Sequence, residues 1–156
     1  MRYERNNDPN YYIEKQHYSN CGSFALNLKG WYDPEEYFYD IYGPIDFWME
    51  SLREDYTNEE LSDMYADVLV EGMLEEFKGE LRLLECIDDE IDDDEELISF
   101  RGVCDNDIDE YDFHFKVFRN GRWMEKHGGG PVRECREWDW GWYISETYYF
   151  AHRKVV

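Results

Sequence analysis

Two residues have side chains suited to covalent chemistry, Cys21 and His114. Cys21 follows Asn20, a residue type that favours the N-cap of a helix, and Cys21, Ala25 and Leu28 share one helical face. The free N–H groups and the dipole at a helix N-terminus favour a thiolate. An imidazole within reach would accept the thiol proton, so the pair predicts nucleophilic catalysis by sulfur. The alternative for Cys21 is a small buried thiol in the core.

A strand is predicted to carry His114. Between Tyr111 and Arg119 apolar residues alternate with polar ones, which puts His114 on the face opposite the apolar set. Asn120-Gly121 then favours a two-residue type I′ turn. The register around this turn places His127 across from His114 and Glu125 diagonally near it. Either side chain could therefore orient the imidazole, although Lys116 lies across from Glu125 and competes for it.

Helices are predicted before strands along the chain. A helical stripe runs from Ile45 to Leu52, and Thr57 with Glu60 forms a capping box for a helix that continues to about Phe77. Aromatic and β-branched residues then predict strands at 81–87, 96–104, 111–119, 121–126 and 141–150. This order predicts the α+β class, with N-terminal helices packed on an antiparallel sheet.

The chain of 156 residues is predicted to form a single domain over residues 1–156, with an acidic insertion at about 85–110. Its net charge is −22, and 18 acidic residues against three basic ones lie between Glu71 and Asp112. The acidic run is either a solvated loop or a surface that binds a basic protein. The candidate partner-binding residues are Asp88, Asp89, Glu90, Asp92, Asp93, Asp94, Glu95 and Glu96.

Composition also argues against several classes of protein. The acidic charge disfavours direct nucleic-acid binding, and no segment approaches the length of an apolar membrane span. The N-terminus has no apolar stretch typical of a secretion signal, so we expect a cytoplasmic protein. The four cysteines lack zinc-site spacing. The segment 105–116 has Glu110 where a calcium loop needs glycine, so neither a metal nor a cofactor is predicted.

Two segments resemble papain-like, NlpC-type cysteine hydrolases of bacteria and their phages. The first is NCGSFALNL, in which Asn20, Cys21, Phe24 and Ala25 match the family pattern N-C-x-x-[YF]-A. The second is DFHFKVFRNGRWMEKHGGGPV, where the matching residues are Asp112, His114, Phe115, Arg119, Gly121, Trp123, Lys126, Pro131 and Val132. The two blocks cover about a quarter of the chain, and the resemblance implies a papain-like core.

The resemblance also assigns roles to the matching residues. It implies that Cys21 is the nucleophile and His114 the general base. Where the family has a histidine before the lysine, this chain has Glu125, whose carboxylate could orient the imidazole instead. The backbone N–H of Cys21, with Gln16 or Asn20 as a side-chain donor, would form the oxyanion hole.

Two functions follow from these observations. The first is a cytoplasmic thiol hydrolase, a peptidase or amidase, acting on a peptide or amide substrate. The second is a non-enzymatic inhibitor or adaptor, of a kind that a phage could encode, whose acidic surface imitates nucleic acid and binds a basic host protein. Binding by the second kind of protein would survive Cys21→Ala and weaken steeply with salt.

Overall fold

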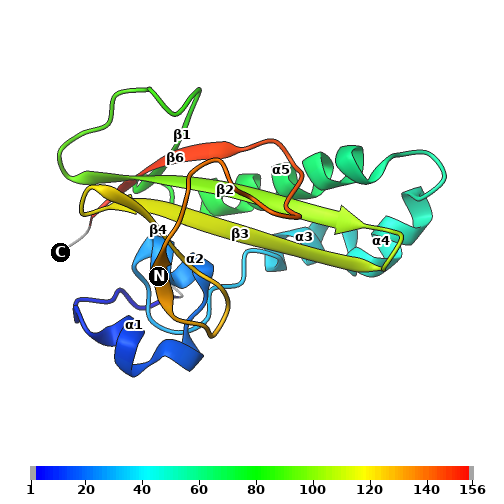
Figure 1. The fold of residues 1–156 in the computed structure, drawn as a ribbon. Helices are drawn as coiled ribbons and strands as arrows, with labels where there is room; N and C mark the ends of the chain where they lie inside the picture. Colours follow the sequence, from blue (N-terminus) through cyan, green and yellow to red (C-terminus); the bar gives the residue numbers. More distant parts are fainter. Residues whose placement is uncertain (1–2, 155–156) are drawn as a thin grey trace.

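The computed structural model describes residues 3–154, and it has helices in its N-terminal half and a sheet in its C-terminal half (Figure 1). This is the α+β class that the sequence predicts. The helical elements are α1 (Tyr11–Glu14), the 3-10 turn η1 (Gln16–Tyr18), α2 (Cys21–Leu26), α3 (Glu36–Tyr42), α4 (Ile45–Leu52) and α5 (Asn58–Glu76).

Six antiparallel strands form one sheet in the order β1-β6-β2-β3-β4-β5. Their bounds are β1 (Leu81–Leu84), β2 (Glu95–Asp105), β3 (Glu110–Arg119), β4 (Arg122–Lys126), β5 (Val132–Glu134) and β6 (Tyr148–Arg153). The long strands β2 and β3 are neighbours at the centre. Their length lets one sheet hold α5 near one end and α2 near the other (Figure 1).

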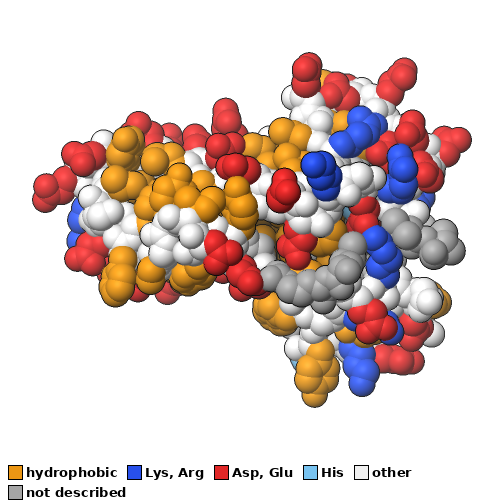
Figure 2. All heavy atoms as spheres, turned by 180° about the vertical axis from the view of Figure 1, so that it is seen from behind, with side chains coloured by type: hydrophobic (Ala, Val, Ile, Leu, Met, Phe, Trp, Pro, Cys, Tyr) orange, Lys and Arg blue, Asp and Glu red, His pale blue; other side chains and the backbone are white. Residues whose placement is uncertain are grey.

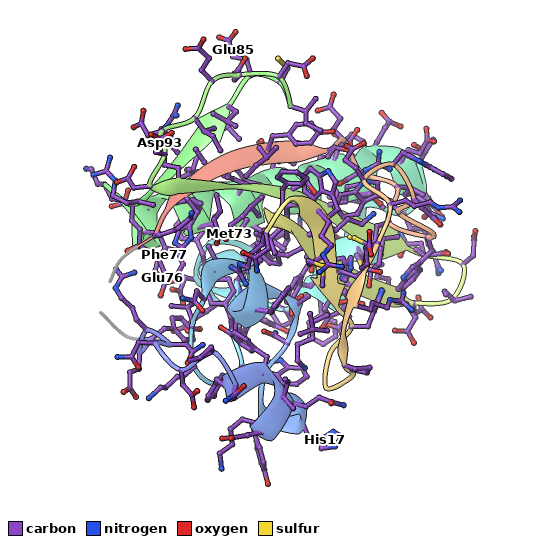
Figure 3. All side chains as sticks on the ribbon, turned by 60° about the vertical axis from the view of Figure 1, so that its left-hand side comes forward. His17, Met73, Glu76, Phe77, Glu85 and Asp93 are labelled. Atoms are coloured by element: carbon purple, nitrogen blue, oxygen red, sulfur yellow. The ribbon has the colours of Figure 1, made fainter. Side chains whose placement is uncertain are left out.

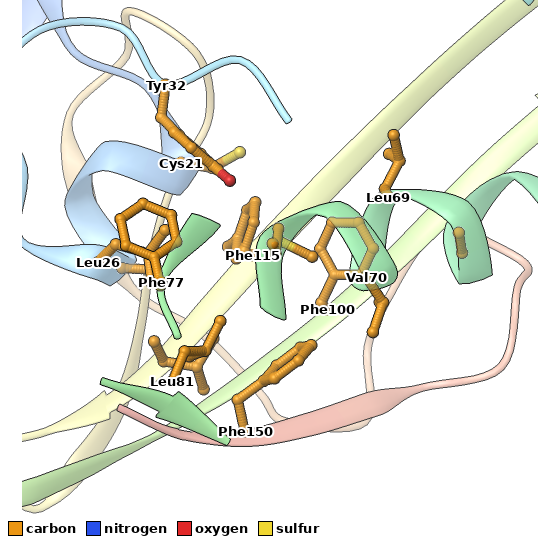
Figure 4. Close-up of a cluster of buried hydrophobic side chains, with 14 of the residues drawn as sticks. Cys21, Leu26, Tyr32, Leu69, Val70, Phe77, Leu81, Phe100, Phe115 and Phe150 are labelled. Atoms are coloured by element: carbon orange, nitrogen blue, oxygen red, sulfur yellow. The ribbon is translucent and has the colours of Figure 1, made fainter. Parts of the chain in front are cut away.

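The core lies between the helices and one face of this sheet. Tyr65 of α5 packs directly on Gly102 of β2. A Cβ atom at residue 102 would lie only 3.0 Å from the Tyr65 ring. Phe100, Phe115 and Phe150 project from β2, β3 and β6 into the same cluster (Figure 4). Burying several aromatic side chains on one face accounts for much of the stabilisation of so aromatic a chain.

Local sequence signals set several element boundaries as predicted. Thr57 and Glu60 form the capping box of α5, and Asn20 caps α2 through its side chain. Helix α2 ends at Leu26, because Asn27 adopts the left-handed conformation that ends helices. The turn residues Asn120 and Gly121 have φ values of 55° and 81°, as a type I′ turn requires.

The segment 141–150, predicted as a strand, is extended only at its end. Residues up to Thr147 form an irregular loop over the sheet, and β6 starts at Tyr148. The loop is fixed by side chains: Arg101 donates to Thr147 and to the Tyr143 carbonyl, and the Ser145 hydroxyl accepts from the Gly102 N–H. Aromatic residues in this stretch therefore serve the packing of a loop. The short strand β5 was not predicted.

The range 85–110 includes more than an acidic loop. Residues 85–94 form the loop, whereas residues 95–105 are the central strand β2 and the residues after it turn back into β3. The acidic character of this stretch thus belongs partly to the sheet. Within residues 3–154, no helix is both long enough and apolar enough to cross a membrane.

Candidate active site

The β3–β4 hairpin brings His114 and Glu125 together. The predicted register holds from Lys116 opposite Glu125 to Arg119 opposite Arg122, and β4 ends at Lys126, one residue before His127. The His114 Nε2 atom lies 2.8 Å from Glu125 Oε1, within hydrogen-bond distance. Both side chains are nearly fully buried. The register of a short hairpin therefore places an imidazole and a carboxylate next to each other in the interior.

The second oxygen of Glu125 has two further partners, His127 and Arg133. This Oε2 atom lies 3.2 Å from Nε2 of His127 and accepts a hydrogen bond from Nε of Arg133 at 3.0 Å. Burial raises the pKa of Glu125, but the hydrogen bond from His114 and the nearby positive charges outweigh it and lower the pKa to about 2. The carboxylate is therefore ionised at neutral pH and can orient an imidazole.

His114 lies between two rings. The His127 imidazole stacks on it with a centroid distance of 4.3 Å, and the Tyr143 ring stacks at 5.2 Å. Burial lowers the pKa of His114, with Glu125 opposing that effect. The imidazole is thus favoured in its neutral form, which is the form that accepts a proton. Among residues 3–154, no hydrogen-bond partner engages Nδ1, the nitrogen turned away from Glu125.

A cavity of about 420 Å³ opens over this pair. Its lining includes His114, Glu125 and His127 from the hairpin. The opposite wall comes from the irregular segment before β6, with Trp140, Trp142 and Tyr143. The cavity could therefore hold a substrate directly above the imidazole, with aromatic rings on one side.

Cys21 lies beside β3 at Phe115, next to the point where the β3–β4 ladder ends. Helix α2 packs against the side of β3 that carries Phe115, so close that a side chain at Gly22 would meet the Phe115 ring at 3.1 Å. In Figure 4 the Cys21 side chain lies next to Tyr32 and Phe115. Cys21 does not line the cavity, and no hydrogen bond joins it to His114 among the described residues.

Backbone N–H groups nevertheless surround the Cys21 sulfur. Burial is the dominant influence and raises the pKa of the Cys21 thiol to about 12, while the N–H groups of Phe115, Gly22 and Cys21 itself lower it. The ladder between β3 and β4 begins only at Lys116, so the Phe115 N–H is available to the sulfur. The sulfur thus lies beside the residue that follows His114, in a setting with donors for an anion.

The two oxyanion candidates have other partners. The Asn20 side chain accepts hydrogen bonds from the N–H groups of Ser23 and Tyr32 and donates to the Tyr32 carbonyl. The Gln16 amide donates to the Gly129 carbonyl at 3.4 Å. Asn20 is therefore committed to capping α2 and holding the next segment, whereas Gln16 makes one long contact.

Sequence reasoning missed Cys135, which lines the cavity. Burial raises the pKa of its thiol to about 11, with Glu125 adding to the effect and Lys116 opposing it. It is the thiol that shares the cavity with His114. Its chain position just after β5 gave no signal, because the wall of the cavity forms only when residues distant in sequence pack together.

Two buried lysines hold the segments around the site. The Lys126 ammonium donates to the carbonyls of Gln16, Ser19 and Gly128, each at 2.6 Å. It thereby fixes the chain just before Cys21 to the end of β4. Sequence patterns gave Lys126 no function, because two of the carbonyls it binds, those of Gln16 and Ser19, lie more than a hundred residues away.

Lys116 plays the equivalent part on the other face. It donates to the carbonyls of Arg136 and Asp139, and its ammonium lies 4.3 Å from the Trp140 ring centroid. The wall of the cavity is thus tied to β3. Because Lys116 binds these carbonyls, Glu125 remains available to His114.

Among residues 3–154, one group of side chains could hold a metal ion: His114, Glu125 and His127, whose ligand atoms lie within 4.8 Å of one another. The two imidazoles are nearly parallel, with 12° between their planes. Stacked rings cannot both point a nitrogen lone pair at one ion about 2 Å away. A metal would therefore require His127 to rotate, and the arrangement fits a hydrogen-bonded acid–base group better.

Much of the acidic run is engaged within the chain. Glu95 pairs with Arg82, Glu96 pairs with Arg119, and Asp89 accepts from the backbone at Glu85. The loop projects from the sheet, as the positions of Glu85 and Asp93 in Figure 3 show. These contacts satisfy several of the carboxylates that were predicted to bind a partner.

Neither known protein families, nor curated proteins, nor solved structures include a match to this chain.

Proposed function

We propose that this chain is a thiol hydrolase of the papain-like type, a peptidase or amidase, with its site at the β3–β4 hairpin. The observation that carries the proposal is the buried pair of His114 and Glu125 below a cavity, with the Cys21 sulfur beside the next residue, Phe115. A buried structural thiol needs neither this base nor three N–H donors. The resemblance of the two sequence blocks supports the same assignment.

The proposed reaction gives each residue one task. The Cys21 thiol passes its proton to Nδ1 of His114, and the sulfur attacks the substrate carbonyl carbon. Glu125 holds Nε2 and stabilises the imidazolium. The C–N bond breaks, and His114 returns the proton to the leaving amine. Water then attacks the thioester, losing a proton to His114, and the acid and the free thiol are released after that proton returns to sulfur.

The raised pKa of Cys21 means that the thiol is protonated before a substrate binds. With the sulfur buried, the neutral thiol is favoured. The thiolate becomes competitive only with a positive charge or further donors nearby, as when His114 takes its proton. The backbone N–H groups of Cys21 and Gly22, at the start of α2, are then positioned to stabilise negative charge.

The first experiment maps thiol reactivity. Each cysteine is alkylated with iodoacetamide at pH values between about 6 and about 9.5. The labelled peptides are quantified by mass spectrometry in wild type and His114→Ala. We expect the Cys21 rate to fall about tenfold or more in His114→Ala, because the base is lost. The exposed Cys86 should be unchanged and serves as the internal control.

Two outcomes would overturn the assignment. If Cys135 is the cysteine whose rate depends on His114, the nucleophile is the thiol in the cavity and not Cys21. If no cysteine depends on His114, the imidazole does not activate a thiol and the hydrolase proposal fails. His17→Ala is the matched control variant, because His17 is exposed and makes no hydrogen bond to the site.

A further inference from the structure

The end of the molecule formed by α3, α4 and the β2–β3 turn has an apolar surface that the hydrolase proposal does not use. Four side chains of the two helices or the turn are more than half exposed: Ile41 at 51%, Tyr42 at 52%, Phe47 at 67% and Ile108 at 58%. Exposed large apolar side chains gathered at one end of a protein mark an interaction site more often than a random surface does. We call these four residues the aromatic end.

Structural contacts join the two parts of this end. The Asn106 side chain of the turn donates to the Met49 carbonyl of α4, and Arg53 donates to the Asn106 carbonyl. The Tyr39 and Tyr111 hydroxyls lie 3.4 Å apart, linking α3 to β3. The helices and the turn are therefore held together as one surface, and the apolar residues need no rearrangement to be presented.

The charge around the aromatic end is almost entirely negative. Between Lys29 and Arg53 the sequence has six acidic residues and no basic one, and between Arg101 and Lys116 it has no basic residue. The exposed carboxylates at this end are those of Glu36, Asp40, Asp46, Glu50, Asp107, Asp109 and Glu110. Figure 2 shows the apolar side chains on the left-hand arm bordered by acidic ones, with most Lys and Arg side chains at the other end.

This surface differs from the acidic loop at 85–94 in the exposed apolar side chains that its carboxylates border. The loop carboxylates Asp89 and Asp94 have partners within the chain, and the next residue, Glu95, pairs with Arg82. At the aromatic end Arg53 is the basic residue near the carboxylates, and it pairs with Asp109 at 3.8 Å. Among residues 3–154, Asp40, Asp46, Glu50 and Glu110 form no ion pair, so their charge is available to an incoming cationic surface.

We propose that the aromatic end is a docking surface for a basic protein segment that presents apolar side chains between lysines and arginines. Complementarity of charge selects the occupant: a second copy of this chain, with net charge −22, would bring like charges together. The apolar residues provide the contact that excludes water, and the ring of carboxylates steers and orients the partner. The proposal is independent of the hydrolase chemistry.

Two synthetic peptides of equal positive charge test it. One is an amphipathic peptide of leucine and lysine with about four helical turns, and the other is an oligolysine with the same number of lysines. Binding to the full chain is measured by fluorescence anisotropy at about 0.15 M salt, where long-range attraction is screened. We expect the amphipathic peptide to bind at least about tenfold tighter.

Variants then locate the binding surface. Ile41→Ser with Phe47→Ser should remove the preference for the amphipathic peptide and leave oligolysine binding unchanged. Asp46→Asn with Glu50→Gln should weaken binding of both peptides and reduce its salt dependence. The matched control is Asp92→Asn with Asp93→Asn in the acidic loop, which removes the same charge and should have little effect. All six positions are exposed, so each variant is expected to fold.

Three results would overturn the proposal. Equal binding of both peptides would show general attraction to negative charge and no apolar docking. An equal loss in the acidic-loop variant would place the binding elsewhere. Concentration-dependent dimerisation in sedimentation experiments, abolished by Phe47→Ser, would show that the aromatic end binds a second copy of the chain. Single variants Ile41→Ser and Phe47→Ser repeat the test if the double variant has a lowered unfolding temperature.

Discussion

The two faces of the β3–β4 hairpin are closed in different ways. On the face that carries Phe115, a helix packs so tightly that Gly22 leaves no room for a side chain. On the face that carries His114, a loop covers the strands and leaves a cavity. Each face has a buried lysine bound to backbone carbonyls, Lys126 on the first and Lys116 on the second. The hairpin therefore has a helix packed on the side beside Cys21 and a cavity over the side that carries the buried His114.

This difference separates a tightly packed side of the hairpin from a side that leaves space for a ligand. The helix face holds Cys21 by packing, and a buried thiol is protected from unwanted reactions. The loop face needs space for a substrate, so its wall is attached through a few strong contacts of Lys116 and Trp140. We therefore expect equivalent substitutions on the two faces to have unequal costs, larger on the helix face.

The largest effect is expected from the two lysines. Lys126→Met leaves the carbonyls of Gln16, Ser19 and Gly128 without a donor in the interior, so it should lower the free energy of unfolding by about 3 kcal/mol. Lys116→Met should cost about half as much, because the loop it holds is closer to solvent. Urea unfolding of both variants measures the difference.

The exposed Lys78 supplies the control for these variants. Lys78→Met should change the free energy of unfolding by less than about 0.5 kcal/mol, as is usual for surface positions. A cost at Lys116 equal to or above that at Lys126 would show that the loop face is as closed as the helix face, and the distinction between the faces would then be wrong.

A pair of matched tyrosines should show a smaller difference in the same direction. The Tyr12 hydroxyl on the helix face lies 2.9 Å from the carbonyls of both Ser23 and Leu28 and shares its one proton between them. Tyr143 on the loop face donates to Asp112 at 2.9 Å. Tyr12→Phe should cost about 1.5 kcal/mol, because buried carbonyls lose a donor.

Tyr143→Phe should cost about half that amount, because the partly exposed Asp112 carboxylate can bind water instead. Thermal unfolding of the two variants under one set of conditions gives the comparison. The two substitutions remove the same atom from residues that are equally buried. Equal losses would therefore mean that solvent reaches both faces to a similar extent.

The features of the fold and the site that could be predicted from the sequence are those made by residues close to one another along the chain. The imidazole–carboxylate pair follows from a local code, since Asn120-Gly121 fixes the turn and the turn fixes which residues face His114. The cap of α2 at Asn20 is local as well. The α+β class follows from the order of periodic segments.

The rest of the site depends on contacts that sequence periodicity does not encode. The face on which α2 packs is decided by the fit of Gly22 against Phe115 and Tyr32, which are distant from each other in sequence. A helix placed on the opposite face would have satisfied the same patterns. The aromatic run near Trp140 looked like a strand because periodicity cannot distinguish ring packing in a loop from ring packing in a sheet.

The smallest expected effect is a dependence of stability on pH that comes from the loop face. Burial lowers the pKa of His114 below its usual 6.5. Below about pH 6.5 this histidine is therefore protonated more readily in the unfolded chain than in the folded one. The free energy of unfolding decreases as the pH falls from 7 to 5. Glu125 has its pKa lowered to about 2, so its contribution is lost only at lower pH, between about 4.5 and 2.

The variant His114→Gln should therefore flatten the pH dependence of the free energy of unfolding between pH 7 and pH 5, by on the order of 1 kcal/mol. Urea unfolding at several pH values measures this slope, and His17→Gln, at an exposed histidine, is the matched control. An unchanged slope in His114→Gln would mean that solvent already enters the cavity and protonates the folded imidazole. The loop face would then be open to water, and the base would be exposed before any substrate arrives.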